Sequence, residues 1–381
     1  MNAADTSWML ISTALVLLMT PALAFFYGGL VRSKNSLNTM MMSYISFGFV
    51  GVLWAVLGYS LAFATGNDYV GDLSRLFLKG VGLEPQGTIP HYLFMCYQGT
   101  FAIITAALIS GAIVERMQFS AYITFISLWC IVVYAPVAHW VWGGGWLAKM
   151  GALDFAGGTV VHVNAGVAAL VAALCVGPRR DYKKAPLLPH NVPFTLLGAG
   201  LLWFGWFGFN AGSALAASSL ATSAFVATHF ASAAGAVSWM IAERVRNGKA
   251  SALGGISGAV AGLATVTQGA GFVEPFSAVL IGLIAGFVCF AMVIIVKIKL
   301  GYDDSLDAFG VHGIGGLMGC LLTGIFATNQ INNALKLPNG SPAPLGWVDG
   351  NAGQVLNQGI GAVIGIAFGG GFTWGSALLR Y

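Results

Sequence analysis

The sequence predicts an all-α polytopic membrane protein, with eleven transmembrane helices arranged as a 5+5 inverted-topology repeat plus a final helix. Of its 381 residues, 57% are hydrophobic and only 8% are charged, whereas an ordinary soluble domain has about 25% charged residues. The apolar residues form runs long enough to cross a bilayer. A segment with an Asp at its start and a His inside also occurs twice. A soluble globular protein is excluded by this composition.

The apolar segments of spanning length are expected near 7–31, 37–64, 91–114, 119–142, 154–176, 192–215, 219–242, 251–270, 275–297, 307–328 and 352–379. The first run is too long for the core of a signal peptide, so it is interpreted as a true span. We treat residues 1–381 as one membrane domain. Its repeat halves cover about 7–176 and 192–328, and the last helix covers about 352–379. The longer polar connections are 65–90 and 329–350.

Basic residues alternate between the loops, which predicts the orientation of the chain. Loops after the odd-numbered helices, together with the chain end, hold thirteen of the 17: Arg32, Lys34, Arg116, Arg179, Arg180, Lys183, Lys184, Arg244, Arg246, Lys249, Lys297, Lys299 and Arg380. The other side holds Arg75, Lys79, Lys149 and Lys336. By the positive-inside rule, the N-terminus lies outside and the C-terminus in the cytoplasm of a cell (plasma or inner) membrane.

Glycines recur every fourth residue within several apolar runs, for example at Gly254, Gly258 and Gly262. This spacing favours close packing of membrane helices. The five cysteines are widely separated in apolar runs, which is typical of small buried side chains.

Several functions are excluded by what the sequence lacks. The one Gly-Lys pair, Gly248-Lys249, is followed by Ala, so no phosphate-binding loop for ATP is present. Any transport must therefore be passive or coupled to an ion gradient. We predict no cofactor and no nucleic-acid partner for the chain.

The fifth and tenth predicted helices resemble each other. The fifth runs from Asp154 past His162, and the tenth runs from Asp307 past His312. The tenth helix comes five positions after the fifth, an odd number, so the two copies must run in opposite directions across the membrane. Inverted repeats of this kind place the functional site near mid-membrane, where the halves meet. The Asp–His spacings differ, eight residues against five, and a coincidental His pair is the alternative.

Two facing histidines suit a narrow polar passage. The helical rise puts His162 roughly 12 Å below Asp154, well inside the hydrocarbon. An unpaired His at that depth should be neutral. Two neutral rings can hydrogen-bond to each other and bind or relay a proton. A metal site would need a third ligand, and Asp154 and Asp307 lie a turn or more from their His, so no metal is predicted.

Both aspartates have a structural interpretation as well. Each precedes the first turn of its helix, where a carboxylate accepts backbone N–H groups. For Asp307 the capping role is preferred. Asp154 lies at the outer mouth and is also a candidate for stabilising an incoming cation. Among the other histidines, only His229 lies in the middle of a span, and a packing role is favoured for it.

Aromatic residues gather toward the outer side in the predicted topology. They occur in helix four around Trp142, in helix six from Trp203 through Phe209 to Ser213, and in helix three from Tyr97 to Phe101. Interfacial anchoring is the usual role of such residues. Aromatic faces combined with a hydroxyl and a carboxylate could also recruit a small cation.

Four motifs in order resemble the ammonium transporter family (Amt/Mep, distantly related to the Rhesus proteins), namely residues 25–32, 142–162, 205–213 and 307–313. The resemblance covers essentially the whole chain, and Trp142 and Ser213 point to the Amt branch. It implies a homotrimer of eleven-helix subunits in the lipid bilayer, each with its own pore.

The resemblance also implies a role for individual residues. Trp142 and Ser213 match the outer recruitment site, which Phe101 helps to line and Asp154 supports. Phe101 and Phe209 match a stacked phenyl gate. His162 and His312 match the twin-His pair of the pore.

The function expected is passive or proton-linked transport of ammonium or ammonia. A dry lumen separates ammonium from potassium because only ammonium can shed its proton. The alternative is an ammonium sensor whose signalling domain is absent from this chain, and an enzyme at the His pair is a third hypothesis. Family members usually carry a cytoplasmic tail that contacts P-II-type regulatory proteins, whereas this sequence stops at Arg380-Tyr381.

Overall fold

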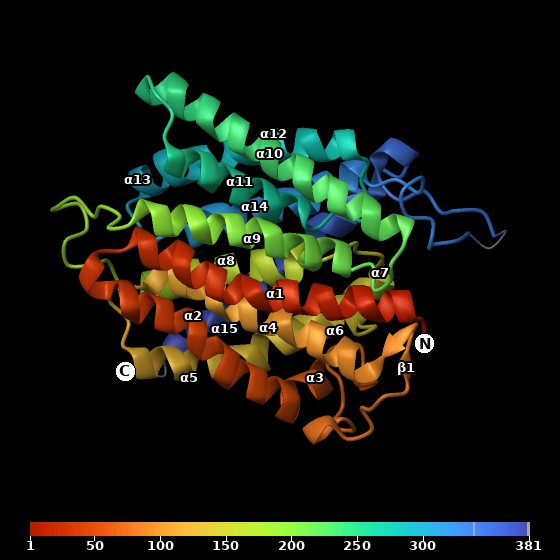
Figure 1. The fold of residues 1–381 in the computed structure, drawn as a ribbon. Helices are drawn as coiled ribbons and strands as arrows, with labels where there is room; N and C mark the ends of the chain where they lie inside the picture. The colour runs from red at the N-terminus through yellow and green to blue at the C-terminus, as the bar shows by residue number, and fades with distance from the viewer. Residues whose placement is uncertain (338–339, 379–381) are drawn as a thin grey trace.

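The computed structural model describes residues 1–337 and 340–378 as a bundle of helices that run roughly side by side (Figure 1). Ten helical segments of the described chain are long and apolar enough to cross a membrane, and an eleventh is shorter. The prediction of an all-α polytopic membrane protein is therefore confirmed.

In the first half of the chain, several spans contain π-helical turns between α-helical parts. The elements are α1 (Ala3–Leu30), α2 (Ser33–Leu53), η1 (Trp54–Gly58), α3 (Tyr59–Phe63), η2 (Leu76–Leu78), β1 (Pro85–Gln86), β2 (Ile89–Pro90), α4 (His91–Ile113), α5 (Phe119–Trp129), η3 (Cys130–Tyr134), α6 (Ala135–Trp142), α7 (Trp146–Met150), η4 (Gly158–Val163) and α8 (Asn164–Val176). The antiparallel strands β1 and β2 form a small hairpin just before α4.

The second half also combines long α-helices with π-helical turns, and the final helix α15 follows it. Its elements are α9 (Val192–Gly212), α10 (Ser219–Asn247), α11 (Ala252–Val266), α12 (Pro275–Ala291), η5 (Met292–Val296), α13 (Lys297–Leu300), η6 (Phe309–Gly313), α14 (Ile314–Phe326), η7 (Trp347–Asp349) and α15 (Gly353–Leu378).

The eighth span is shorter than the predicted 251–270, because α11 has 15 residues and the chain turns after Val266. α11 packs against α10, α12, α14 and α9, so neighbouring helices rather than lipid surround most of it. A Cβ added to Gly262 would lie 2.2 Å from the carbonyl oxygen of Ala231, and one on Gly258 would lie 2.4 Å from that of Gly235. The predicted glycine spacing thus brings α11 into backbone contact with α10.

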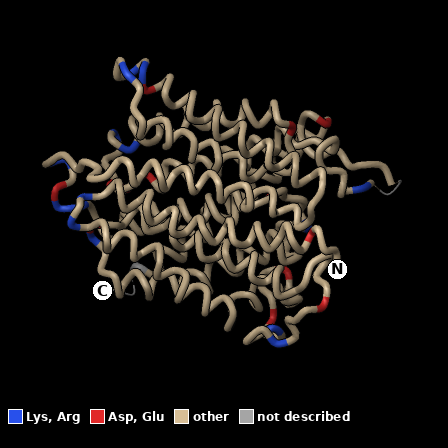
Figure 2. The backbone as a smooth tube through the Cα atoms, viewed as in Figure 1, with Lys and Arg blue, Asp and Glu red and all other residues tan. Residues whose placement is uncertain are grey.

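Charged residues concentrate at the two ends of the bundle and leave its middle uncharged (Figure 2). Most Lys and Arg residues lie at one end, which we call the basic end (Figure 2). The N-terminus lies at the opposite end, and α15 finishes at the basic end (Figure 1). This is the distribution that the loop charges predict, although Arg380 lies outside the described residues.

Ion pairs at the basic end connect the two halves of the chain. Arg179, in the connection between the halves, donates to Glu115 at 2.9 Å and to Asp303 at 2.8 Å. Arg32 also donates to Glu115 at 2.9 Å. Burial alone would raise the pKa of Glu115, but hydrogen bonds from Arg32, Asn35 and Arg179 outweigh it and lower the pKa to about 2. The carboxylate therefore stays ionised. It joins its own loop to the loop of Arg32 and to the connection that contains Arg179.

Candidate functional site

The two His-bearing segments cross at the centre of the bundle, and each begins with a π-helical turn. His162 lies in η4 and His312 lies in η6. Glycine allows the crossing, because a Cβ on Gly166 would lie 2.2 Å from the backbone nitrogen of Gly313. In the other copy, a Cβ on Gly316 would lie 2.8 Å from the backbone nitrogen of Val163. A glycine four residues after each His thus lets the two backbones touch.

A carboxylate caps each of these segments. The prediction that Asp307 caps the second one is wrong. Asp304, rather than Asp307, accepts the backbone N–H groups of Ala308 and Phe309 at 3.1 and 2.8 Å. The Asp–His spacing is therefore eight residues in both copies, Asp154 to His162 and Asp304 to His312. The difference of spacing expected from sequence disappears, and the two segments match more closely.

The histidines contact each other through one ring nitrogen each. The Nδ1 atoms of His162 and His312 lie 3.2 Å apart, and the rings are within 15° of parallel. Trp206 stacks on His162 at 5.4 Å between ring centroids. The indole N–H of Trp206 donates to Thr267 at 2.9 Å, which fixes its ring. Both imidazoles are buried, and the Nε2 atom of His162 has no hydrogen-bond partner among the described residues.

The space around the pair is small and apolar. A cavity of about 10 Å³ is lined by both histidines, Trp206, Phe209 and aliphatic side chains. Such a volume holds about one water-sized molecule. We call this cavity the lumen.

Two phenyl rings in contact, tilted by 34° to each other, close the lumen on the side away from the basic end. The ring centroids of Phe101 and Phe209 lie 4.3 Å apart, and both side chains are buried. The ring centroid of Phe209 also lies 6.0 Å from that of His162. The structure therefore brings together four residues predicted for the pore: the two phenylalanines and the two histidines.

Beyond the phenyl rings lies a second cavity of about 290 Å³, which we call the aromatic cavity. Trp142, Ser213 and Phe101 line it, as predicted for a recruitment site. Tyr97 also lines it, and this residue was not assigned to the site from sequence. Its hydroxyl lies 3.3 Å from Ser213 Oγ and within 3.0 Å of the Phe209 carbonyl oxygen. The spacing of Tyr97 and Phe101 by four residues, which places both on one helix face, is the signal that could have revealed it.

Asp154 does not line this cavity. It acts on the cavity through the residues that it holds in place. Its carboxylate accepts four backbone N–H groups, from Gly157 to Val160, at 2.6 to 3.1 Å. Its carbonyl oxygen accepts the indole N–H of Trp142 at 2.9 Å. Asp154 thus fixes both the start of the His162 segment and the position of Trp142.

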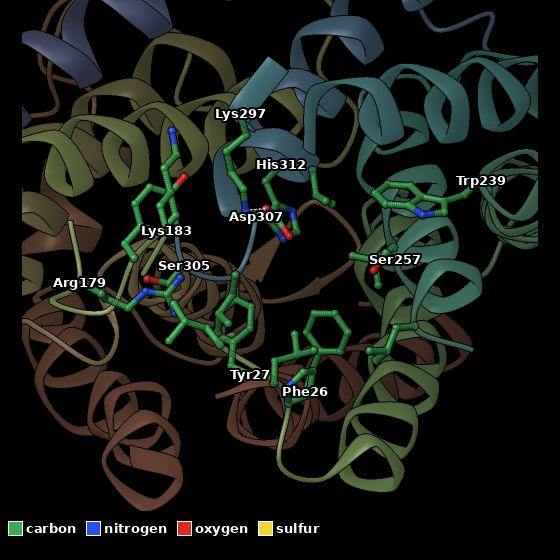
Figure 3. A pocket seen from close by; sticks show the side chains of 18 of the residues that line it. Phe26, Tyr27, Arg179, Lys183, Trp239, Ser257, Lys297, Ser305, Asp307 and His312 are labelled. Carbon is green, nitrogen blue, oxygen red and sulfur yellow. Dashed lines mark hydrogen bonds and ion pairs between the residues drawn. The ribbon is translucent and has the colours of Figure 1, made fainter. Parts of the chain in front are cut away.

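A third cavity, of about 430 Å³, opens at the basic end (Figure 3). We call it the basic-end cavity. His312 lines both this cavity and the lumen. Asp307 faces it and forms an ion pair with Lys297 (Figure 3). The His pair therefore lies between two larger cavities, with the phenyl rings on one side only.

The remaining predicted candidate, His229, lies elsewhere. Its ring packs 5.6 Å from Trp203 on an exposed face of the bundle and takes no part in the lumen. Among residues 1–337 and 340–378, no three His, Cys, Asp or Glu side chains gather as a metal site would require.

Comparisons with known proteins identify the family of the chain. Residues 7–380 match the sequence profile of the Ammonium Transporter Family. An ammonium transporter of Bacillus subtilis is 53% identical over 337 residues, which cover 88% of this chain and 83% of the relative. The crystal structure of Saccharomyces cerevisiae Mep2 is 37% identical with a TM-score of 0.92, covering 100% of this chain and 85% of that one. A structure titled Sensor Amt Protein is 30% identical with a TM-score of 0.89, covering 99% and 93%. The chain belongs to the ammonium transporter family.

Proposed function

We propose that this chain moves ammonium across the membrane by passing ammonia and a proton separately through the lumen. The observation that carries the proposal is the His162–His312 pair, enclosed in about 10 Å³ between two cavities of about 290 and 430 Å³. No hydrated ion fits into the lumen, so a cation must lose its water and its charge before entering it.

Recruitment takes place in the aromatic cavity. The rings of Trp142, Tyr97 and Phe101 present their negative faces to a cation, and the Ser213 hydroxyl offers an oxygen acceptor. Asp154 contributes through Trp142 and through the backbone that it holds. The Phe101–Phe209 gate then admits the substrate only when its rings move apart.

Selectivity follows from acid–base chemistry. Ammonium and potassium carry the same charge, and the aromatic cavity attracts both. Ammonium can give up a proton and cross as a neutral molecule, whereas potassium keeps its charge and faces the full cost of desolvation.

The His pair offers a route for the proton. When the Nδ1–H of one imidazole donates to the Nδ1 of the other, the first ring has a bare Nε2 and the second carries an Nε2–H. A proton bound at the bare Nε2 of His162 lets this ring pass its Nδ1 proton to His312. His312 then releases its Nε2 proton toward the basic-end cavity. One proton enters and one leaves, which reverses the tautomers of both rings. The pair must therefore return to its starting tautomers before it can carry the next proton.

The basic end faces the cytoplasm in this proposal, and the protein resides in the cell membrane. Lys and Arg residues are retained on the cytoplasmic side during insertion, and they gather at one end of the bundle (Figure 2). The aromatic cavity then opens outward. Modification of Lys184 or Lys149 by an impermeant amine reagent on intact cells distinguishes the two ends, since only Lys149 should react.

The subunit is proposed to act as a homotrimer. Phe204, Phe225, Phe230 and His229 are exposed on α9 and α10. A polar imidazole facing lipid at mid-span is costly, and a neighbouring subunit would cover it. The mass of the protein measured in a lipid nanodisc tests this arrangement.

A P-II-type regulatory protein is proposed to bind the loops of the basic end. Lys183 and Pro189 line the basic-end cavity, so a protein seated on this loop would cover the inner mouth of the pore. Co-elution of the purified membrane protein with such a regulator, lost on reversing the charge of Lys183 and Lys184, tests the contact.

Reconstitution into liposomes tests the main proposal. We expect an ammonium-dependent current and no potassium current, both compared with empty vesicles. The double variant H162A/H312A, which lacks the His pair, serves as the control. Intact ammonium binding without any current would instead favour the sensor alternative, and conversion of ammonium into another compound would favour an enzyme. The 53% identity to an ammonium transporter favours transport.

A further inference from the structure

The two His-bearing segments differ in charge at one position. Residues 304–316, which we call the inner copy, carry a carboxylate at a place where residues 154–166, the outer copy, have none. Asp307 follows Asp304 by three residues, as Gly157 follows Asp154. Both positions have left-handed backbone, with φ of 62° at Asp307 and 115° at Gly157. Glycine adopts this conformation freely, whereas residues with a Cβ adopt it less often, although Asp and Asn tolerate it better than most. The inner copy therefore keeps an Asp at a position where the fold prefers glycine, and strain of this kind often marks function.

The Asp307 carboxylate does not cap its helix, because Asp304 already accepts those backbone N–H groups. It instead points into the basic-end cavity, where it pairs with Lys297 (Figure 3). Lys297 is also tied to the backbone, since its Nζ donates to the Asp304 carbonyl oxygen at 3.2 Å. The Asp307 side chain retains 31% of its exposure. It is therefore held in place and accessible to water.

No other described residue that lines this cavity carries a carboxyl group. Its remaining titratable side chains are Arg179, Lys183, Tyr27 and Tyr182, besides Lys297 and His312. The neighbouring Asp303 and Asp304 are buried and engaged elsewhere, the first by Arg179 and the second by the helix start. A proton leaving His312 toward the cytoplasm thus finds one carboxylate in its path.

We propose that Asp307 is the inner proton acceptor of the pore, with Lys297 as the residue that positions it. This inference rests on the proposed function. Cationic His312 gives its Nε2 proton to a water of the basic-end cavity, and that water gives a proton to the Asp307 carboxylate. The Asp307 carboxyl group then releases a proton to cytoplasmic water and is again ionised. Each step transfers one proton, and the imidazole returns to its neutral form.

The repeat supplies the variant that tests this role. Asp307→Gly removes the carboxylate and gives the inner copy the residue type that the outer copy has at this position. Asp307→Asn keeps the shape of the side chain, and Asp307→Glu keeps the acid. Asp181→Asn is the matched control, since Asp181 pairs with Arg32 at the same end and does not line the cavity.

The measurement is the current of proteoliposomes after ammonium is added on one side, in weak and in strong buffer, with the same buffer on both sides. In weak buffer we expect D307G and D307N to carry roughly tenfold less current than the wild type, and D181N and D307E to stay within about twofold. Adding imidazole, which fits the cavity and accepts protons, should restore the two defective variants and leave the wild type unchanged.

A merely structural role for Asp307 would not respond to buffer. Currents of D307G and D307N equal to the wild type, or reduced currents that imidazole does not restore, would overturn the inference. A wild-type protein without any current would instead refute the proposed transport function, so the two failures are distinguishable.

Discussion

The backbone of Gly166 lies directly against that of Gly313, because a Cβ on Gly166 would come within 2.2 Å of the Gly313 nitrogen. This contact lets the two π-helical turns approach closely enough for their imidazoles to meet.

Replacing Gly166 by Ala should therefore separate the two segments. Because the obstructing atom belongs to the backbone and cannot rotate away, we expect a loss of about 1–3 kcal/mol in stability from overpacking. Ammonium current should fall with it. Thermal unfolding in detergent and the liposome current measure the two effects. Gly200→Ala is the control, since a Cβ there meets nothing within 4 Å; equal behaviour of the two variants would contradict this account of the crossing.

Replacing Tyr97 by Phe should weaken recruitment without affecting selectivity. The variant keeps the ring but loses the hydroxyl that bonds near Ser213 and Phe209. One hydrogen bond contributes about 0.5–1.5 kcal/mol, so the ammonium concentration for half-maximal current should rise about two- to tenfold. Tyr92→Phe, at an exposed position of the same helix, should behave as the wild type. An unchanged half-saturation in Y97F would remove Tyr97 from the site.

Replacing His162 by Asp should reduce the discrimination against potassium. The substitution puts a fixed negative charge into a lumen that otherwise contains only neutral groups, and so offsets the desolvation cost of a cation. We expect a measurable potassium current in liposomes, whereas the wild type carries none. The ammonium current of the same vesicles shows that the variant is folded. Complete potassium exclusion by H162D would argue against selection by deprotonation.

Replacing Thr267 by Val should disturb the His pair indirectly. Thr267 accepts the indole N–H of Trp206, which stacks on His162. The isosteric Val leaves that buried donor unpaired, at a cost of about 1–3 kcal/mol. The ammonium current should drop while half-saturation at the aromatic cavity stays unchanged. Thr267→Ser keeps the acceptor and should recover the current; if it does not, packing rather than the hydrogen bond is responsible.

The ion pairs of Glu115 predict the acid sensitivity of the basic end. The pKa of Glu115 is about 2 in the folded chain, below about 4.3 for an unperturbed Glu. Its stabilisation is therefore complete above about pH 4.3 and is lost as the pH falls toward 2. Glu115→Gln should lower the unfolding temperature at pH 7, and the difference from wild type should shrink across that interval. Glu274→Gln, at an exposed position, should show no such trend. A constant difference at all pH values would contradict the assignment.

Much of the fold could be predicted because bilayer thickness limits the length of each span and the charges of the loops alternate. The helix of residues 252–266 was predicted too long, since its length is set by neighbouring helices that hydropathy does not reveal. The start of α1 at Ala3 depends on Asn2, whose side chain accepts from the backbone of Ala4 and Asp5.

The site was predicted in part. His162, His312, Phe101 and Phe209 meet as expected, because their positions follow from the repeat and from family motifs. Asp307 was paired with Asp154 because it is the first residue of the motif that begins the tenth helix. The choice between Asp304 and Asp307 depends on the backbone turn, which sequence alone does not show. Tyr97 was named among the outer aromatic residues but was not assigned to the site, because a Tyr near the start of a membrane helix usually anchors it at the interface.

The size of the lumen has a consequence for the water balance of a cell. A passage that holds about one small molecule next to the His pair cannot contain a continuous column of water. Ammonia must cross alone, without solvent moving beside it. A membrane rich in this protein should therefore take up nitrogen without swelling faster in dilute medium, which stopped-flow light scattering of proteoliposomes after an osmotic jump would show.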